Sequence, residues 1–347
     1  MKTPQITIRD IAKALGISVS TVSRALHDSP EISTERRKAI KEYAHKHHYT
    51  PNLIASSLRA SRNHNSHIIG VVVPKILHYY FADVLAGIEE KATEMGYRIM
   101  VSQSNEEYAK EKQIIEAFEE ARVCGVIISQ AEDTRDYDHF RRLIDKEIPL
   151  IFYDRICTGI QTPRVVIDDY AGAYTAVEYL VRTGCRRIGF MGSAMNLEIS
   201  KNRLNGYKDA LLKNGLRPEA DLTIDFDQAH NSNEEQALID RMLNREERPD
   251  ALFANNDVIG TQVLNACKRA GLRVPDDVSI VCFTNSSMTR VCDPQLTCVD
   301  QRGNLVGRSA AELLIDRLEG RLDNSRQNNR IIKTNLIVRA STLPLRE

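Results

Sequence analysis

The 347-residue sequence lacks the features that mark several large classes of protein. No apolar run approaches the roughly 18 residues of a membrane-spanning helix, and residues 1–5 do not begin an apolar signal segment. The seven cysteines form no C-x-x-C pair and lie mostly inside apolar runs, which predicts buried free thiols. We therefore expect a cytoplasmic protein without disulfides and without a membrane partner.

Signatures of catalysis and of metal binding are also missing. The sequence contains no H-E-x-x-H, no G-x-S-x-G, no Walker loop and no spaced set of Cys and His. His45, His47 and His48 are typical of a frayed helix end, and Asp168 with Asp169 fits a strand end followed by a helix cap. We expect no enzymatic activity, no catalytic residue, no metal and no cofactor.

Charge is present in equal amounts of both signs but is unevenly distributed. The chain has 47 basic and 47 acidic residues, so its formal net charge is zero. Residues 1–62 carry 11 Lys or Arg against 5 Asp or Glu, which gives +6 for this head and −6 for the remainder. A basic head on an acidic body indicates that only the head meets a polyanion.

Residues 7–26 have the pattern of two short helices joined at Gly16. Apolar residues at helical spacing predict a buried stripe on each helix: Ile8, Ile11, Ala12 and Leu15 on the first, and Val22, Ala25 and Leu26 on the second. Thr7 with Asp10 is expected to cap the first helix, and Ser18 the second. Val19, Ser20, Ser23 and Arg24 remain on the outer face of the second helix. This is the arrangement of a helix-turn-helix, although an ordinary αα-hairpin has the same outline.

A third helix is expected from a cap at Ser33 to about His47. It would bury Ile32, Ala39, Ile40, Tyr43 and Ala44, and it would present Arg36, Arg37, Lys38 and Lys41 to DNA phosphates or to solvent. Pro51 disfavours helical geometry at Thr50 and ends this helix. Residues 53–59 are too short for a stable isolated helix, and the polar residues 60–67 are typical of a linker.

From residue 68 onward, apolar strands alternate with amphipathic helices, which predicts parallel sheets with right-handed crossovers. Strands are expected near 68–73, 97–102, 124–129, 149–153, 164–168, 187–191, 222–226, 250–254, 278–283 and 297–300. Helices are expected at 81–95, 108–122, 171–183, 201–214, 233–244, 258–270 and 303–319. The series is long enough for two α/β lobes with a ligand cleft between them. Residues 330–342 alternate like a strand that closes the second sheet.

Specific strings identify a family at this point. The chain resembles the lactose/galactose repressor (LacI/GalR) family of bacterial transcription regulators over nearly its whole length. The strings that carry the resemblance stand in the family's order: T-V-S-R at 21–24, Y-T-P-N at 49–52, D-D-V-S-I at 276–280 and T-C-V-D-Q at 297–301. The resemblance implies a helix-turn-helix head at 1–50, a hinge helix and linker at 51–67, and a two-lobed body like a periplasmic binding protein at 68–347. It implies a dimeric, effector-controlled repressor of a near-palindromic operator.

The resemblance also assigns the DNA-binding residues. Val19, Ser20 and Arg24 fall where members of the family bind base edges in the major groove, and a guanidinium can bond a guanine bidentately. Leu58 falls on the residue that wedges between base steps in the minor groove, with the small Ala55 beside it. The predicted set is completed by Thr7, Ser18, Thr21, Ser23 and Asn52. An alternative for Leu58 is a linker residue that packs on its own body.

The effector site is assigned in the same way. Tyr80 and Phe81 fall on an aromatic pair that stacks on effector rings in the family, and Arg203 falls on an arginine that hydrogen-bonds the ligand. The strand ends that line the cleft carry Asp154, Asn256, Asp257 and Gln301. Phe226 is expected to form a further stacking wall. The sequence departs from the family at Thr284, where many members have an aspartate that binds ligand hydroxyls. A hydroxyl binds a sugar more weakly than a carboxylate does, which disfavours recognition of an ordinary hexose. The expected effector is a small polar molecule such as a sugar or a sugar derivative. For Tyr80 and Phe81, plain core packing is the alternative.

Two other function classes share parts of this pattern. A small-molecule-binding receptor without a regulatory role has the same two-lobed body but no use for residues 1–58. A dinucleotide-binding enzyme needs a glycine fingerprint after its first strand, and residues 69–74 supply a single glycine, Gly70. We therefore predict a DNA-binding regulator controlled by a small polar effector.

Overall fold

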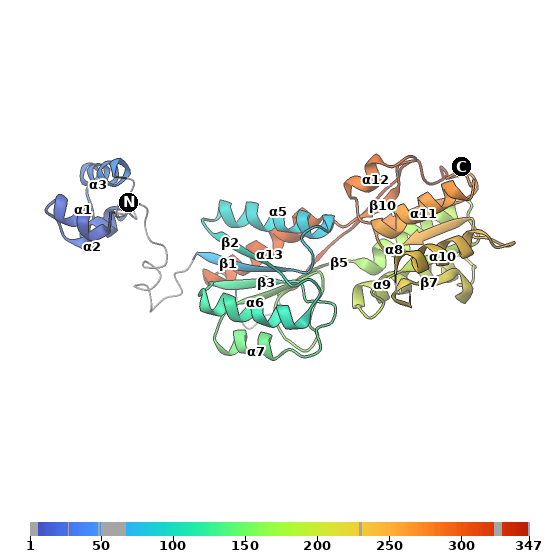
Figure 1. The fold of residues 1–347 in the computed structure, drawn as a ribbon, viewed down its shortest axis with the longest axis horizontal. Coiled ribbons are helices and arrows are strands. Elements are labelled where there is room, and N and C mark those ends of the chain that lie inside the picture. Colours follow the sequence, from blue (N-terminus) through green and yellow to red (C-terminus); the bar gives the residue numbers. More distant parts are fainter. Residues whose placement is uncertain are drawn as a thin grey trace. The chain divides into compact units, whose positions relative to one another are not determined.

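The structure is a computed structural model that describes residues 6–26, 28–47, 49, 67–228, 231–322 and 328–345 (Figure 1). The chain divides into two compact units, Met1–Ser66 and His67–Glu347. Across the described ranges, no helix combines the length and apolar character needed to cross a membrane.

The described residues of the first unit form three helices: α1 (Ile8–Ala14), α2 (Val19–Leu26) and α3 (Thr34–Lys46). They enclose a small core whose buried members are Ile11, Ala12, Val22, Ala25, Ile40 and Ala44. The turn after α1 depends on Gly16, whose φ of +62° lies in the left-handed region that a glycine adopts without steric cost. The predicted helix-turn-helix is therefore present.

The predicted caps of α1 and α2 are confirmed. The Asp10 amide donates to Thr7 Oγ1 at 3.3 Å and the Thr7 amide donates to Asp10 Oδ2 at 2.9 Å, which is a capping box. The Thr21 amide donates to Ser18 Oγ at 3.1 Å. On α3, Ser33 stands at the N-cap but its side chain makes no cap hydrogen bond. The prediction that Ala39 is buried is wrong, because α3 turns only the stripe of Ile40 and Ala44 fully inward.

The second unit has two α/β lobes, each with a six-stranded sheet. The first sheet has the order β11-β5-β4-β3-β1-β2, and its paired strands are parallel. Its strands are β1 (Ile68–Val73), β2 (Arg98–Gln103), β3 (Gly125–Ile128), β4 (Leu150–Tyr153), β5 (Arg164–Ile167) and β11 (Arg330–Ile332). Helices α5 (Tyr79–Glu94) and α13 (Gly303–Leu318) cover one face, and α6 (Tyr108–Glu120) and α7 (Asp138–Asp145) the other (Figure 1).

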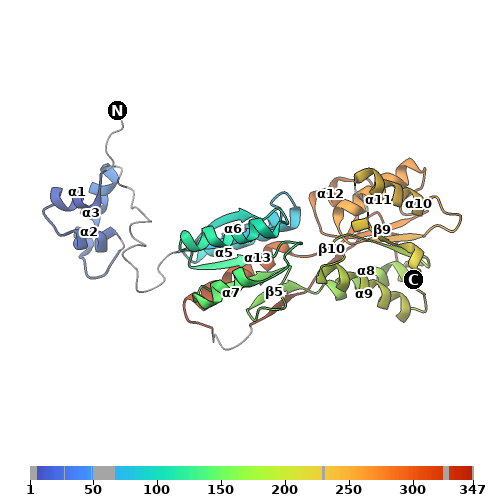
Figure 2. The ribbon, with the colours of Figure 1, turned by 60° about the horizontal axis from the view of Figure 1, so that its bottom comes forward.

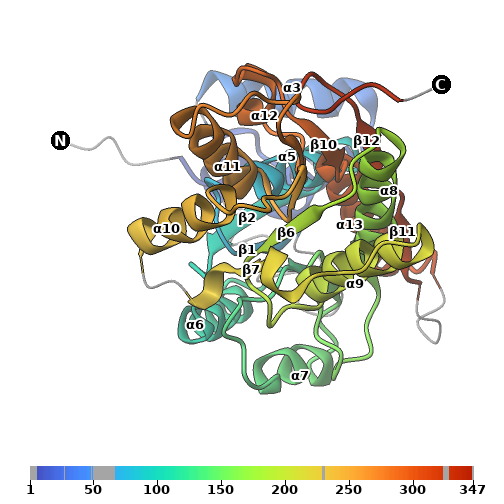
Figure 3. The ribbon, with the colours of Figure 1, turned by 90° about the vertical axis from the view of Figure 1, so that its right-hand side faces the viewer.

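The second sheet has the order β12-β10-β9-β8-β6-β7 and is parallel except at β12, which pairs antiparallel with β10. Its strands are β6 (Ile188–Gly192), β7 (Thr223–Asp225), β8 (Ala251–Ala254), β9 (Ser279–Phe283), β10 (Thr297–Asp300) and β12 (Asn335–Ile337). Helices α8 (Asp169–Arg182) and α9 (Glu198–Lys213) lie on one side of β6, and α10 (Ser232–Leu243) and α11 (Asp257–Arg269) on the other (Figure 3). A short helix, α12 (Ser287–Val291), follows β9.

The chain passes between the lobes three times, near Asp168, near Arg302 and near Thr334. The passages lie together, since the Asp168 amide donates to the Ile332 carbonyl at 3.2 Å and Asp300 is in register with Asn335 (Figure 2). The prediction that residues 330–342 close the second sheet is confirmed for β12, but it misses β11. This segment gives β11 to the edge of the first sheet and β12 to the edge of the second.

Two helix pairs pack backbone against backbone. A Cβ on Gly307 of α13 would lie 2.0 Å from the Val84 carbonyl oxygen of α5, and a Cβ on Gly87 would lie 2.1 Å from that of Asn304. In the second lobe, a Cβ on Gly206 of α9 would lie 2.4 Å from the Tyr170 carbonyl oxygen of α8. Glycine at these positions sets the distance between the paired helices.

Candidate functional site

The outer surface of α2 is polar and small. Ser20 and Arg24 are exposed, whereas Val19, Thr21 and Ser23 are half-buried. Val19 also packs against the core of the first unit. Ser18, which is exposed, joins its hydroxyl to that of Ser20 at 2.7 Å. This face fits the close approach of a helix to base edges in a major groove.

Arg24 forms an ion pair within the first unit. Its Nη1 lies 3.0 Å from Glu31 Oε2, and the two side chains are 58% and 66% exposed. A pair this exposed contributes little to stability. The guanidinium can therefore exchange Glu31 for another acceptor at small cost.

The cations of α3 divide into two kinds. Lys41 Nζ lies 2.6 Å from Asp28 Oδ2, and Arg37 Nη1 donates to the Asp28 carbonyl at 3.0 Å. The hydrogen bond from Lys41 lowers the pKa of the exposed Asp28 carboxyl. Arg36 and Lys38 are exposed. The sequence pattern did not distinguish these two from the pair that holds Asp28. The predicted hinge residues Asn52, Ala55 and Leu58 lie outside the described residues.

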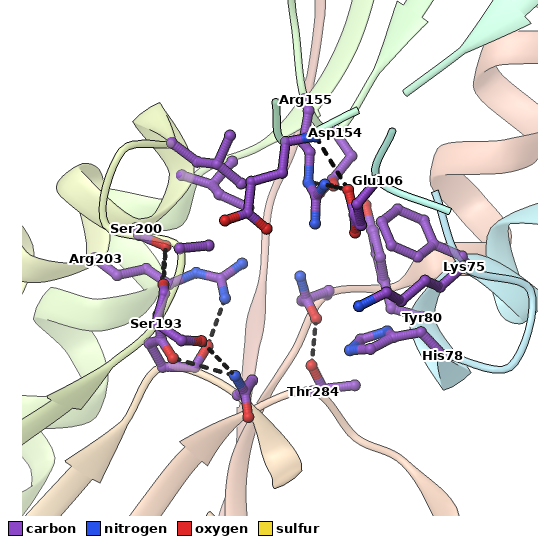
Figure 4. Close-up of a pocket in the computed structure, with 18 residues that line it drawn as sticks. Lys75, His78, Tyr80, Glu106, Asp154, Arg155, Ser193, Ser200, Arg203 and Thr284 are labelled. Atoms are coloured by element: carbon purple, nitrogen blue, oxygen red, sulfur yellow. Dashed lines mark hydrogen bonds and ion pairs between the residues drawn. The ribbon is translucent and has the colours of Figure 1, made fainter. Parts of the chain in front are cut away.

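A polar pocket of about 200 Å³ opens between the two lobes of the second unit (Figure 4). The structure brings seven of the nine predicted effector residues into its wall: Tyr80, Phe81, Asp154, Arg203, Asn256, Thr284 and Gln301. They come from the first turn of α5, from the second turn of α9 and from the ends of several strands, where the loops of a parallel α/β sheet gather. Seven of the nine residues therefore lie around one pocket, and their role in binding an effector stays a prediction.

The other two predicted residues, Phe226 and Asp257, are not among the residues that line this pocket. Phe226 begins a short 3-10 turn after β7 and is buried in the core beneath α10 and α11. Asp257 starts α11, is buried, and has an Oδ1 atom without a hydrogen-bond partner among the described groups. An aromatic residue at a strand end suited either a wall or a core, and the core is where the structure places it.

Several lining residues were not predicted. They include Lys75, His78, Glu106, Glu132, Arg155, Ser193, Ser200 and Asn255. Arg155 and Asn255 adjoin predicted residues at strand ends, and Ser193 follows β6 directly, so the strand-end rule could have found all three. Glu106 and Glu132 lie in longer loops that carry no periodic signal.

Arg203 projects from α9 toward the centre of the pocket (Figure 4). Its Nε and Nη2 each lie 2.7 Å from Asp169 Oδ1, and its Nη1 donates to the Asn255 carbonyl at 2.6 Å. Its guanidinium carbon lies 3.9 Å from the centre of the Phe283 ring, over the ring. Burial raises the pKa of the Asp169 carboxyl to about 6, although Arg203 opposes that rise. Asp169, expected only as part of a helix start, is a structural member of this site.

Arg155 is fixed in a similar manner on the opposite wall. It pairs with Glu106, its Nε lies 4.0 Å from Asp154 Oδ2, and its guanidinium carbon lies 5.6 Å from the centre of the Phe81 ring. Burial raises the pKa of the Asp154 carboxyl, against the effect of Arg155. The two arginines thus stand on facing walls, each held by a carboxylate and an aromatic ring.

Uncharged polar groups complete the floor. Thr284 Oγ1 donates to Gln301 Oε1 at 2.7 Å, and both side chains are buried. Burial lowers the pKa of the His78 imidazole, so the ring is neutral near pH 7.

The backbone around the pocket is strained at three residues. Asp154, Ala194 and Thr284 have positive φ angles of 57°, 52° and 78°, which are uncommon for residues other than glycine and costly for a β-branched residue such as threonine. Strained backbone on several walls of one pocket is typical of a binding site.

The chemistry of the pocket suits a small polar ligand. Within the described part of the chain, no group of three or more His, Cys, Asp or Glu side chains could hold a metal ion. Amide and hydroxyl groups can instead donate and accept hydrogen bonds, and guanidinium groups can donate them. Tyr80 and Phe81 line the pocket, but each is only 4% exposed and packs in the core of the second unit, as the core-packing alternative expected.

Parts of both units match the sequence models of known families. Residues 7–52 match the sequence model described as "Bacterial regulatory proteins, lacI family", and residues 177–342 match that of a periplasmic binding protein-like domain. The HTH-type transcriptional repressor CytR of Escherichia coli K12 is 30% identical over 343 residues, which is 98% of this chain and 97% of CytR.

Solved structures agree with the fold. The transcriptional regulator CelR in complex with cellobiose is 25% identical with a TM-score of 0.71, covering 97% of this chain and 100% of that one. The lac repressor dimer bound to operator and the anti-inducer ONPF is 23% identical with a TM-score of 0.84, covering 98% and 100% of the two chains.

Proposed function

The chain belongs to the lacI family of bacterial regulatory proteins, and we propose that it acts as a homodimer on a near-palindromic operator under the control of an effector in the pocket between its lobes. It is a DNA-binding transcriptional regulator; CytR is an HTH-type transcriptional repressor and CelR a transcriptional regulator. The observation that carries the proposal is the presence, in one chain, of a helix-turn-helix with an exposed Arg24 and a polar two-lobed pocket.

The DNA-binding part of the proposal rests on the first unit. Ser20 and Arg24 contact base edges, with Val19 packed close behind them, while the exposed Arg36 and Lys38 contact phosphates. Leu58, by its place in the family pattern, enters the minor groove as a wedge when two hinge segments pair on DNA. Base contacts from two copies one turn of DNA apart require a two-fold symmetric site.

Dimer formation is supported by apolar side chains on the second unit. Leu77 is 99% exposed and Val291 is 80% exposed. Burying such side chains against a second copy removes them from water, which favours association. The lac repressor structure that this chain resembles in fold is also a dimer.

The effector part of the proposal rests on the pocket. Arg203, Asn256 and Gln301 supply hydrogen bonds to a sugar or sugar derivative, and Phe81 supplies a stacking surface. Cellobiose in CelR is a ligand of this kind. Coupling between two sites is reciprocal and typically amounts to about 1–3 kcal/mol, so operator DNA must change effector affinity by the same factor as the effector changes operator affinity.

A deletion separates this function from that of a two-lobed receptor without a regulatory role. Removal of residues 1–60 should abolish operator binding and leave ligand binding unchanged. Full-length chain that binds ligand but selects no sequence from random DNA would overturn the proposal and favour the receptor. We also propose that the chain has no enzymatic activity, like the regulators it matches, and that it acts in the cytoplasm, where bacterial DNA lies.

A further inference from the structure

The architecture of the pocket would by itself attract anions. Parallel strands end at this cleft, so the N-termini of several helices face it: Tyr80 lies in the first turn of α5, Ser200 in that of α9, and Asn256 caps α11. Helix N-termini present free amides and a partial positive charge, which is how many α/β proteins bind phosphate.

This chain places its own acids at the N-terminus of α11 and at that of α8, whose first residue, Asp169, contacts Arg203 of the pocket. Asp168 caps α8 by accepting a hydrogen bond from the Ala171 amide at 2.9 Å, and Asp169 is the first residue of that helix. On α11, Asn256 caps the helix and the buried Asp257 stands in its first turn. The partial positive charge of α8 and α11 is therefore already satisfied from within the protein.

The arginines of the pocket are neutralised in the same way. Asp169 Oδ1 lies 2.7 Å from two nitrogens of Arg203, and Glu106 pairs with Arg155, which also has Asp154 beside it. Arg203 retains N–H groups that these contacts do not use, since a guanidinium carries five. It can thus donate to a ligand oxygen without presenting a net charge.

The remaining charges do not reverse this balance. His78 is neutral because burial lowers its pKa. Lys75 is exposed at the rim and is matched in the lining by Glu132. Three cations thus line the pocket against three carboxylates, with Asp169 behind them as a fourth.

We propose that the pocket accepts an uncharged, hydroxyl-rich effector and rejects its phosphorylated form, with Asp169 as the residue that sets this specificity. A phosphate ester would bring about two negative charges next to Arg203 and Asp169, and the carboxylate would repel it. A hydroxyl instead accepts from the free N–H groups of Arg203 and donates to Asp154. The inference rests on the proposed function, because it concerns the ligand of the same pocket.

Inorganic sulfate tests the charge of the pocket without knowledge of the effector. Full-length wild type should bind millimolar sulfate no better than Arg203→Gln does, as measured by titration calorimetry. Asp169→Asn should bind sulfate at least about tenfold more tightly, since it removes the internal competitor for Arg203 and since about 1.4 kcal/mol corresponds to a factor of ten. Asp169→Asn combined with Arg203→Gln should lose this gain.

Asp168→Asn is the matched control, because it makes the same charge change one residue away and asparagine caps helices as well as aspartate. It should bind sulfate like the wild type. An equal gain in Asp168→Asn, or no gain in a folded Asp169→Asn, would overturn the proposal. If Asp169→Asn does not fold, Glu106→Gln, which frees Arg155, is measured with the same expectation and the same refuting result.

Paired ligands provide the second arm and separate this proposal from the proposed function. Wild type is titrated with sugars and nucleosides and with the phosphate ester of each. Tighter binding of any ester than of its uncharged parent would overturn the specificity proposal while leaving the regulator intact. If no compound changes operator binding, the proposed effector control fails, and the sulfate comparison still decides the role of Asp169.

Discussion

Replacing Arg24 by alanine should separate recognition of DNA from stability of the first unit. The Arg24 side chain is 58% exposed and its partner in the structure is Glu31 at 3.0 Å. An exposed pair of this kind contributes about 0–1 kcal/mol, so the free energy of unfolding should fall by no more than that. A bidentate contact of Arg24 with a guanine would account for about 1–3 kcal/mol of binding free energy.

Two further variants distinguish a base contact of Arg24 from a general effect of charge on DNA binding. Lys38→Ala removes an exposed cation from α3 and should weaken binding to all DNA sequences alike, with a shallower dependence on salt. Glu31→Gln removes the internal acceptor of Arg24 and a negative charge near the DNA. It should tighten operator binding by up to about 1 kcal/mol, or about fivefold.

The assay begins with selection of the preferred site from random DNA. Fluorescence anisotropy at several salt concentrations then gives affinity for that site and for sites changed at single base pairs, while urea unfolding gives stability. Arg24→Ala should lose preference at one base pair in each half-site. The assignment of Arg24 to a base fails if the variant loses affinity equally for every sequence, as Lys38→Ala should, or if its loss of affinity follows a loss of stability.

Two predictions concern the second unit. Because burial raises the pKa of Asp169 from 3.8 to about 6, this carboxyl stabilises the folded state fully below pH 3.8 and loses that contribution as the pH rises through 6. At about 1.4 kcal/mol per pKa unit, this change in the free energy of unfolding is about 3 kcal/mol. Asp169→Asn should remove this dependence on pH, which urea unfolding of the variant and the wild type from pH 4 to neutrality would show. Parallel curves of unfolding free energy against pH would contradict the prediction. Gly307→Ala should lower the free energy of unfolding by about 1–3 kcal/mol or more, since its Cβ would lie 2.0 Å from the Val84 carbonyl oxygen. Unchanged thermal unfolding would show that α5 and α13 separate freely.

The first unit could be predicted closely because its signals are local. Helical spacing, the capping box of Thr7 with Asp10, and Gly16 at the turn each act within a few residues. The alternation of strands and helices in the second unit is also local, so both lobes were found. The local pattern does not reveal which sheet a three-residue strand joins. β11 pairs with β5, which lies far earlier in the chain, so the pairing depends on contacts that are distant in sequence.

The pocket could be located from strand ends, but its electrostatics could not. Asp169 begins a helix, and an acid at that place is explained by the helix alone until Arg203, 34 residues later, is seen at 2.7 Å. Phe226 and Asp257 follow strands as lining residues do, yet Phe226 is in the core and Asp257 is buried away from the lining. Side-chain direction at a strand end depends on tertiary packing that spacing does not reveal.

The three passages between the lobes have a consequence for the order in which the protein is made. The first lobe needs α13 and β11, which follow the whole second sheet except β12. A nascent chain can therefore complete its helix-turn-helix early, while the first lobe must wait for residue 332 to leave the ribosome. A chain terminated near residue 300 would expose the surface of β3, β4 and β5 that α13 covers, and would thus be a substrate for proteases before it could occupy DNA.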